Sequence, residues 1–230
     1  MSKVYAHRGA SAELPENTLP AFARALELGA DGIELDVHLS RDGVPVVIHD
    51  DSVNRTTNGE GAVADMAVAD LQALDAGGGA GVPTLAEVLD LVGDRMHVDI
   101  EVKAAAAADA VLAEIIRRPT LRFAISSFNH DVLRHVRAVD PQVELWPLTL
   151  GVADDVLATA NALGSPCIAV HDPLLNAEIV EYARGRGVEC WVWTVNDPER
   201  AVMLAQMGAI GICTDNPAAM LERMRERGAL

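Results

Sequence analysis

The stretch GIELDV, residues 32–37, decides the fold because two acidic residues interrupt an otherwise apolar run at alternate positions. Side chains two residues apart on a β-strand project from the same face, so Glu34 and Asp36 form a polar pair while their aliphatic neighbours pack on the other face. The stretch VDIEVK, residues 98–103, repeats this alternation. Both stretches therefore predict strands that present polar side chains on one face.

Histidines end two other short apolar runs, VYAH at residues 4–7 and VVIH at residues 46–49. Any one of these segments, taken alone, also fits a strand of a half-exposed antiparallel sheet. All four segments, however, are followed by turn or loop residues, which places their polar side chains at the carboxyl ends of strands. Three carboxylates, two histidines, an arginine and a lysine are typical of a catalytic site; these residues are Glu34, Asp36, Glu101, His7, His49, Arg8 and Lys103.

Strands and amphipathic helices alternate along the rest of the chain. The strand candidates are residues 4–6, 32–37, 97–102, 122–126, 143–147, 167–170, 189–194 and 210–214. Apolar residues at three- and four-residue spacings predict helices over residues 17–28, 85–92, 107–117, 131–139, 153–163, 177–186, 199–206 and 218–227. Eight strands in strict alternation with eight helices predict a (β/α)₈ TIM barrel.

A small insertion follows the second strand. Residues 44–48 predict a short extra strand, and a polar, glycine-rich stretch continues from Asp50 to Val82. Loops longer than about 12–15 residues in compact domains are usually functional or disordered. Because residues 50–82 begin directly after His49, we expect them at the rim of the active site, within a single domain that spans residues 1–230.

Composition limits the partners. The formal net charge is −16, with no run of lysine or arginine, which argues against a nucleic-acid backbone or an anionic membrane surface. No apolar run reaches the length of about 20 residues that crosses a bilayer, so we expect no stable membrane association. The first predicted strand begins by Lys3, which leaves no stretch for a signal peptide. Three cysteines without disulfide or metal-ligand spacing read as buried thiols in a reducing cytoplasm.

The ordered sequence blocks resemble the glycerophosphodiester phosphodiesterase family, in its cytoplasmic bacterial form. The blocks are HRG at 7–9, PENT at 15–18, ELDV at 34–37, VVIHD at 46–50, RTT at 55–57, PTL at 83–85, EVK at 101–103, SSF at 126–128, WTVN at 193–196 and TD at 214–215. The resemblance covers essentially the whole chain. It implies a TIM barrel with a small insertion after the second strand, in agreement with the pattern of strands and helices.

The resemblance also implies a role for each candidate residue. Glu34, Asp36 and Glu101 would bind a divalent cation, His7 and His49 would act as general base and acid, Arg8 and Lys103 would hold the phosphate, and Trp193 and Phe128 would lie beside the glycerol moiety. Carboxylates without a nearby cysteine suit a hard ion such as Mg²⁺ or Ca²⁺, with Mn²⁺ also compatible. The implied reaction hydrolyses a small-molecule glycerophosphodiester to glycerol-3-phosphate and an alcohol.

Two other functions stay open from the sequence. A phospholipase D-like enzyme that cleaves lysophospholipids would use the same barrel but would need an apolar lip for an acyl chain. A non-catalytic barrel that binds phosphorylated ligands is disfavoured because phosphate binding alone needs neither the histidines nor the three carboxylates. Neither the oligomeric state nor the preferred alcohol follows from the sequence.

Several polar residues have simpler structural interpretations. A tryptophan at position 193 would ordinarily plug a barrel, and Glu16 and Asn17 precede a helix and would organise that loop. The Asp50-Asp51 pair reads as solvated turn charges. Four of the histidines outside the blocks are expected at the surface or as helix caps; these are His97, His130, His135 and His171.

Overall fold

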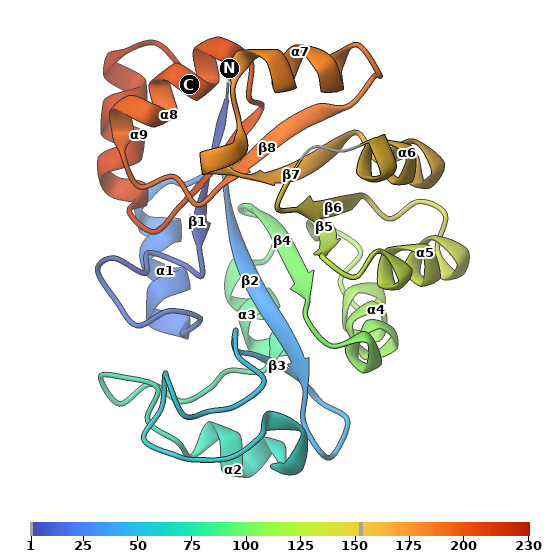
Figure 1. Ribbon diagram of the computed structural model, residues 1–230. Coiled ribbons are helices and arrows are strands. Elements are labelled where there is room, and N and C mark those ends of the chain that lie inside the picture. Colours follow the sequence, from blue (N-terminus) through green and yellow to red (C-terminus); the bar gives the residue numbers. More distant parts are fainter. Residues whose placement is uncertain (1, 152–153) are drawn as a thin grey trace.

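The strands pair in parallel and close into a barrel. The computed structural model describes residues 2–151 and 154–230. The barrel strands are β1 (Lys3–His7), β2 (Gly32–Leu39), β4 (His97–Val102), β5 (Arg122–Ser127), β6 (Leu145–Thr149), β7 (Cys167–His171), β8 (Glu189–Trp193) and β9 (Gly211–Thr214). They follow one another around the sheet in chain order, and β1 pairs with both β9 and β2, which closes the ring. The predicted (β/α)₈ barrel is confirmed (Figure 1).

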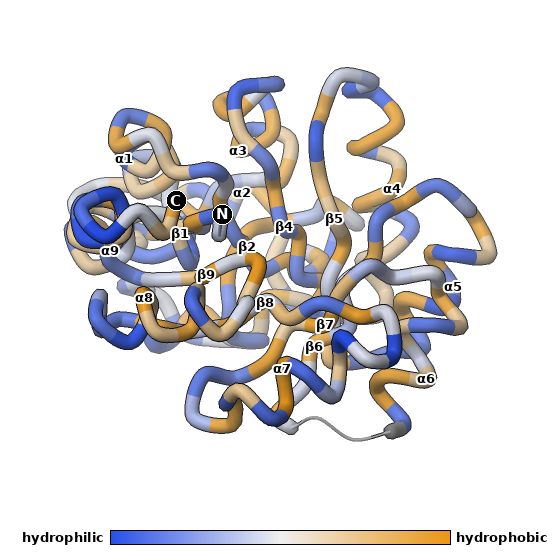
Figure 2. The backbone as a smooth tube through the Cα atoms, turned by 90° about the horizontal axis from the view of Figure 1, so that it is seen from above, coloured by the Kyte–Doolittle hydropathy of each residue, from blue (hydrophilic) through white to orange (hydrophobic). Residues whose placement is uncertain are grey.

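Helices cover the outside of the barrel, with α1, α4, α5, α6 and α9 at the periphery of the view from above (Figure 2). Their bounds are α1 (Leu19–Leu28), α2 (Val68–Gln72), α3 (Leu85–Val92), α4 (Ala108–Ile116), α5 (His130–Val139), α6 (Asp154–Leu163), α7 (Ala177–Arg184), α8 (Pro198–Met207) and α9 (Pro217–Glu226), with 3₁₀ turns at Val63–Asp65, Ala105–Ala107 and Asp172–Leu174. The expected helix start at Ala153 lies outside the described residues. Each predicted helix is otherwise present within a few residues of its expected bounds.

Local capping sets the helix ends. The Thr18 side chain accepts a hydrogen bond from the Ala21 backbone N–H, and Gly29 ends α1 in the left-handed region at φ 75°. Thr84 and Glu87 form a reciprocal capping box at the start of α3. These contacts fix where α1 begins and ends and where α3 begins.

Aromatic rings fill the lower part of the barrel. The Tyr5 and Trp191 ring centroids lie 4.4 Å apart in an edge contact, and Trp146 stacks on Trp191 at 4.7 Å. A Cβ atom at Gly211 would lie 1.9 Å from the Trp191 ring, and one at Gly32 would lie 2.5 Å from the Tyr5 ring. Glycines therefore make the space for the plug that supports the site above it.

The insertion folds as an extension of β2. Strand β3 (Pro45–Val47) pairs antiparallel with the end of β2, which matches the extra strand expected at residues 44–48. Helix α2 and the loops beyond β3 lie at the lower edge of the view in Figure 1. A separate apolar cluster holds this segment together; its buried members are Val46, Ile48, Val53, Val63, Leu71, Ala76 and Val82. In the part of the chain that the structure describes, no helix combines the length and apolar character needed to cross a membrane.

Candidate active site

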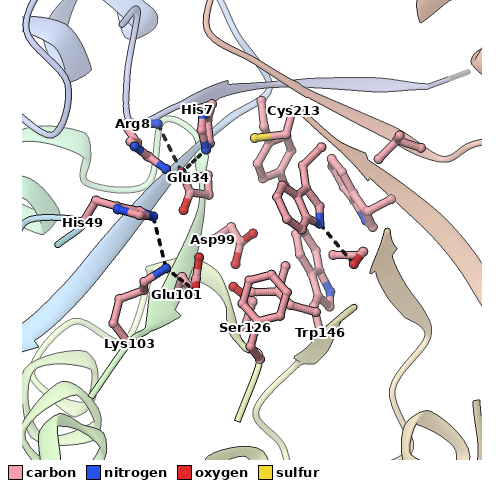
Figure 3. A pocket seen from close by; sticks show the side chains of 17 residues that line it. His7, Arg8, Glu34, His49, Asp99, Glu101, Lys103, Ser126, Trp146 and Cys213 are labelled. Atoms are coloured by element: carbon pink, nitrogen blue, oxygen red, sulfur yellow. Dashed lines mark hydrogen bonds and ion pairs between the residues drawn. The ribbon is translucent and has the colours of Figure 1, made fainter. Parts of the chain in front are cut away.

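The polar ends of β1, β2 and β4 open into a cavity of about 160 Å³ (Figure 3). Strands on the two sides of the barrel give it two different walls. The polar wall comprises His7, Arg8, Glu34, His49, Glu101 and Lys103, and the wall from β5 onward includes Phe128, Trp146, Leu148, Ala169, Trp191, Trp193 and Cys213. The structure therefore brings the predicted site residues together. Asp36 is not among the side chains that line the cavity.

Three carboxylates converge at the centre of the polar wall. Ligand oxygens of Glu34, Asp36 and Glu101 lie within 4.8 Å of one another, and the three residues are 6%, 0% and 8% exposed. Burial, and then the neighbouring Asp36, raise the pKa of Glu34 well above its usual range and that of Glu101 to about 7. Burial also acts to raise the pKa of Asp36, but Arg8 and Lys103 outweigh it and hold this pKa low.

This triad fits a divalent cation. Its donors are all carboxylate oxygens, the ligands that hard cations prefer, and the buried Asp36 Oδ1 accepts no hydrogen bond in the described chain. Repulsion between the carboxylates is part of what raises the pKa of Glu34 and Glu101, and a cation between them would relieve it. The acidic residues at alternate strand positions can therefore hold a metal ion.

Two cationic side chains flank the triad. Arg8 Nε lies 3.2 Å from Asp36 Oδ2, and Lys103 Nζ lies 2.9 Å from Glu101 Oε1 and 3.6 Å from Asp36 Oδ1. Arg8 adopts a left-handed backbone conformation at φ 57°, as does Asn17 at φ 56°. Non-glycine residues in this region store strain, which other contacts must offset. The Asn17 side chain supplies one of these contacts by donating to Asp36 at 2.8 Å.

His7 is held by a carboxylate at the end of the last strand. The His7 Nδ1 atom lies 2.6 Å from Asp215 Oδ1, and because an ionised carboxylate only accepts, Nδ1 carries the hydrogen. Asp215 also accepts from the Asn196 side-chain amide at 2.6 Å and the Ser11 hydroxyl at 3.2 Å. Burial opposes ionisation of Asp215, but the hydrogen bond from His7 prevails and lowers its pKa to about 2. The His7 Nε2 atom, 3.9 Å from Glu34, faces the triad.

His49 is held in a similar way from the insertion. Its Nδ1 lies 2.6 Å from Asp50 Oδ1, and its Nε2 lies 3.3 Å from Lys103 Nζ. Arg55 binds Asp50 through two hydrogen bonds, of 2.7 and 3.0 Å, and these lower the pKa of Asp50. The Asp50 carboxylate, expected as a solvated turn charge, is instead the partner of His49, the residue immediately before it in the chain.

Arg55 also connects the insertion to Arg8. Its guanidinium donates to both carboxylate oxygens of Glu16 at 2.9 Å, and Glu16 accepts from Arg8 Nη1 at 2.9 Å. A continuous chain of charged groups therefore runs from His49 to Arg8 through residues 50, 55 and 16. We name this chain of residues (His49, Asp50, Arg55, Glu16 and Arg8) the charge bridge. The expectation that Glu16 and Asn17 only organise the helix start was too narrow, since both contact site residues.

The apolar wall carries the two aromatic candidates. Phe128 packs edge-on against Trp193 with centroids 5.5 Å apart, and Phe128 is 42% exposed at the rim. The Trp193 indole N–H donates to the Ala169 carbonyl, and its ring contacts that of His171 at 5.0 Å. Trp193 therefore lines the cavity and is not the plug, which Tyr5, Trp146 and Trp191 form.

Of the remaining histidines, His97 departs from the expected surface or capping position, whereas His171 is the residue that precedes the 3₁₀ turn Asp172–Leu174, at its N-cap. His171 contacts Trp193 at the cavity wall, and His97 stacks on Trp146 with centroids 5.5 Å apart at the lower end of the barrel. Burial, and then the nearby Lys3, lower the pKa of His97 to about 4. Both histidines stand at strand ends, where strand alternation turns their rings inward. His130 and His135 contact the Leu148 carbonyl and Asp109.

The family is decided by comparison with known proteins. The model of the glycerophosphoryl diester phosphodiesterase family matches residues 7–219. The chain belongs to this family. The match begins at His7, the last residue of β1, and ends within α9, so it includes every candidate residue.

Individual relatives agree with the family match. The chain is 40% identical to a glycerophosphodiester phosphodiesterase of Caldanaerobacter subterraneus subsp. tengcongensis, over 98% of each chain, and 36% identical to one of Bacillus altitudinis, over 94% of this chain and 96% of the other. An Oleispira antarctica phosphodiesterase, solved with its product sn-glycerol-3-phosphate, superposes with a TM-score of 0.93 at 27% identity, covering 98% of this chain and 97% of the other. A Thermotoga maritima glycerophosphodiester phosphodiesterase superposes at 0.84 and 31% identity, covering 96% and 98%.

Some site residues carried little signal in the sequence. In the sequence, Asp215 was marked only as part of the TD block. It follows the last strand, β9, which closes the barrel by pairing with β1. Arg55 and Asn196 were likewise visible only as members of the RTT and WTVN blocks, because loops carry no periodicity that would point to their contacts. Asp99 shares the strand face of Glu101 and Lys103, Ser126 pairs with Glu101 on the neighbouring strand, and both line the cavity (Figure 3). Burial raises the pKa of Asp99 to about 8.

Proposed function

We propose that this family member hydrolyses glycerophosphodiesters to glycerol-3-phosphate and an alcohol, with a divalent cation and two histidines. One observation carries the proposal. A carboxylate triad lies in one cavity between two cationic side chains and two histidines, and a further carboxylate holds each histidine. The product named for the Oleispira antarctica relative supports the same substrate class. The 50–82 insertion, through the charge bridge, belongs functionally to this single domain.

The cation would be held by Glu34, Asp36 and Glu101. When bound, it would supply positive charge next to the phosphodiester, which gains negative charge on the way to the transition state. Mg²⁺, Ca²⁺ and Mn²⁺ all accept an oxygen donor set of this kind. Arg8 and Lys103 hold the phosphate from either side, and their charge favours the transition state over the ground state.

The two histidines transfer protons through Nε2. Each Nδ1 donates to a carboxylate, so Nε2 is the atom that exchanges a proton with the reacting groups, and Nε2 of His49 does so beside Lys103 Nζ at 3.3 Å. His7 acts as general base on the nucleophile, and His49 as general acid toward the leaving alcohol. The nucleophile is the glycerol hydroxyl next to the ester, giving a cyclic phosphate that water then opens, or water itself. Trp193 and Phe128 pack against the carbon atoms of the glycerol.

The first experiment removes metal with a chelator and restores Mg²⁺, Ca²⁺ or Mn²⁺ singly. Glycerophosphocholine and glycerophosphoethanolamine are the substrates, and release of glycerol-3-phosphate is measured. Metal-dependent release is the expected result. No release from either substrate with any of the ions would contradict the proposal.

Three buried free cysteines suit a reducing compartment and support a cytoplasmic location.

Lysophospholipid cleavage is the second candidate, and one observation favours it. Phe128 and Leu150, in the loops after β5 and β6, are 42% and 64% exposed and give the rim some apolar surface. Lysophosphatidylcholine, offered below the concentration at which it forms micelles, tests this activity. Faster release of choline from it than from glycerophosphocholine would favour the second candidate.

A further inference from the structure

A histidine that has no part in the proposed proton transfers reaches the backbone of His49. His38 lies near the end of β2 and shares the face of Glu34 and Asp36, because side chains two residues apart on a strand project the same way. Its Nε2 atom lies 3.1 Å from the carbonyl oxygen of His49. A carbonyl oxygen only accepts, so Nε2 carries the hydrogen and donates it.

The pairing of β2 explains why a side chain is needed at this point. Strand β4 pairs along one edge of β2, and two strands share the other edge, β1 beside residues 32–34 and β3 beside residues 37–39. The pairing with β3 continues by one bond, from the Ile48 N–H to the Asp36 carbonyl at 3.0 Å. His49 therefore lies where this edge of β2 changes from one partner strand to the other, and the backbone ladder ends before it.

The His38 ring takes the place of the next ladder bond. Among the residues that the structure describes, it is the one group that donates to the His49 carbonyl. Asp50 holds the other end of His49, at Nδ1, but it is the next residue in the chain and moves with the same segment. The bond from His38 fixes this segment directly to the strand that carries Asp36. A catalytic side chain needs such support to keep its working geometry.

The same contact occurs once more, away from the proton-transfer residues. His130 Nε2 lies 3.1 Å from the Leu148 carbonyl, and both His38 and His130 are half-buried. A histidine that donates to a carbonyl is therefore not in itself a functional feature. What distinguishes His38 is the residue that accepts its hydrogen bond, the proposed general acid.

We propose that His38 is a positioning residue for His49, which it holds in place for proton transfer by extending the pairing of β2 and β3 by one side-chain hydrogen bond. The inference rests on the proposed function and deepens it by naming a residue through which the barrel controls the general acid. His38 is not among the side chains that line the cavity, so it acts through His49 and not on the substrate. Its loss should therefore lower kcat and leave KM nearly unchanged.

The test uses three substitutions of His38 that differ in reach. The side-chain nitrogen of glutamine stands where Nε2 of histidine stands, that of asparagine stands nearer the backbone, and leucine has no donor. His38→Leu and His38→Asn should lower kcat for glycerophosphocholine by about three- to tenfold, the scale of one hydrogen bond, with KM changed by less than about twofold. His38→Gln should keep kcat within about twofold of the wild type, because its amide can donate to the same carbonyl.

His130→Leu is the matched control, since it removes a hydrogen bond of the same kind and length. It should lower Tm about as much as His38→Leu and leave kcat at the wild-type value. Wild-type kcat in His38→Leu and His38→Asn would overturn the inference. Equal losses of kcat in His38→Leu and His38→Gln would also overturn it, because the loss would then not depend on the donor. Leucine and asparagine differ in polarity and volume, so whichever variant folds decides the question.

A spectroscopic measurement separates the inference from the proposed function. Nitrogen NMR shifts of the His49 imidazole, assigned by comparison with His49→Ala, report which ring nitrogen carries the hydrogen. The wild type should show the Nδ1–H form alone, whereas His38→Leu should show a mixture, because its ring leaves Asp50 part of the time. If the wild type releases no glycerol-3-phosphate, the proposed function fails, and these spectra alone decide the inference. Identical His49 shifts in the wild type, His38→Leu and His38→Asn would then overturn it.

Discussion

The two histidine–carboxylate pairs have the same geometry but different supports. In both pairs Nδ1 lies 2.6 Å from a carboxylate oxygen. Asp215 belongs to the end of the barrel and is held by neutral donors from Ser11 and Asn196. Asp50 belongs to the insertion and is held by the charged Arg55. The barrel fixes one catalytic group through its closed sheet, whereas the insertion needs ion pairs to fix the other.

This difference has a physical reason. The Asp215 carboxylate adjoins three adjacent chain segments whose positions the parallel strands already set, so neutral hydrogen bonds are enough. Asp50 follows a three-residue strand at the edge of the barrel, where few backbone contacts hold it. Hydrogen bonds between charged groups are about twice as strong as neutral ones, and they give a bidentate pair a defined direction. The charge bridge thus replaces regular secondary structure.

The largest effect on kcat should come from removing either catalytic histidine ring. His7→Ala and His49→Ala should each lower kcat by about 10²- to 10⁴-fold, because general acid and general base both act in the transition state. Calorimetric titration should show metal binding largely intact. His135→Ala, at an exposed ring bonded to Asp109, is the control. Activity that survives in one ring variant would remove that histidine from the mechanism.

Changing the carboxylates should have the next largest effect. Asp215→Asn and Asp50→Asn should lower kcat by about 10²-fold or more, because an amide allows the ring to turn or to change tautomer. KM should change little, since neither carboxylate is expected to touch the substrate. Steady-state kinetics on both variants tests whether the pairs are equivalent. A loss confined to one variant would show that only that histidine depends on its partner.

Arg55 tests the support from the insertion. Arg55→Ala should lower kcat by about tenfold, the scale of a lost charge-assisted hydrogen bond, and Arg55→Lys should recover only part because it loses the bidentate geometry. The wild-type advantage should shrink at 1 M salt, since Arg55 is half exposed and its ion pairs are screened. Arg24→Ala removes another exposed arginine paired with two glutamates and should leave kcat unchanged. Equal rates for Arg55→Ala and wild type would mean that the charge bridge has no part in catalysis.

Asn196 gives the matching test in the barrel. Asn196→Ala removes one of three side-chain donors to the Asp215 carboxylate, together with the amide oxygen that accepts from Thr214 and the Asp215 N–H, and should lower kcat only a few-fold. This loss should stay constant as salt rises, in contrast with that of Arg55→Ala. Measuring both variants over the same salt series compares the two supports directly. A salt-dependent loss in Asn196→Ala would contradict the distinction between neutral and charged support.

His97 shows what happens to a barrel histidine without a carboxylate partner. Its pKa is lowered to about 4, first by burial, so the unfolded chain binds a proton below about pH 6.5 whereas the folded chain binds it only near pH 4. The stability that neutral His97 contributes is therefore complete above pH 6.5 and is lost as the pH falls toward 4. His97→Phe should flatten the fall of Tm over this window while leaving kcat unchanged. Identical curves of Tm against pH for His97→Phe and the wild type would contradict this prediction.

Much of the fold followed from the sequence because its signals are local. The alternation of Glu34 and Asp36 with aliphatic residues reports strand faces, and three- and four-residue apolar spacings report helices. The carboxyl-end position of the polar residues then brings the triad, both histidines and both cations into one place. Residues in loops carry no such periodicity. Arg55 meets Glu16 across 39 positions, and only the folded insertion shows that contact.

The sequence by itself determined the order of strands and helices, the parity that turns the triad and Lys103 inward, and the family. Only the tertiary structure decided that Asp215 serves His7, because this carboxylate reaches the ring through the closure of β9 onto β1, whereas Asp50 and His49 are neighbours in the chain. It also decided that Trp146 and Trp191 plug the barrel while Trp193 lines the cavity. The depth of a side chain within a barrel depends on how neighbouring strands are staggered. That stagger is a property of pairing between segments that are distant in the sequence.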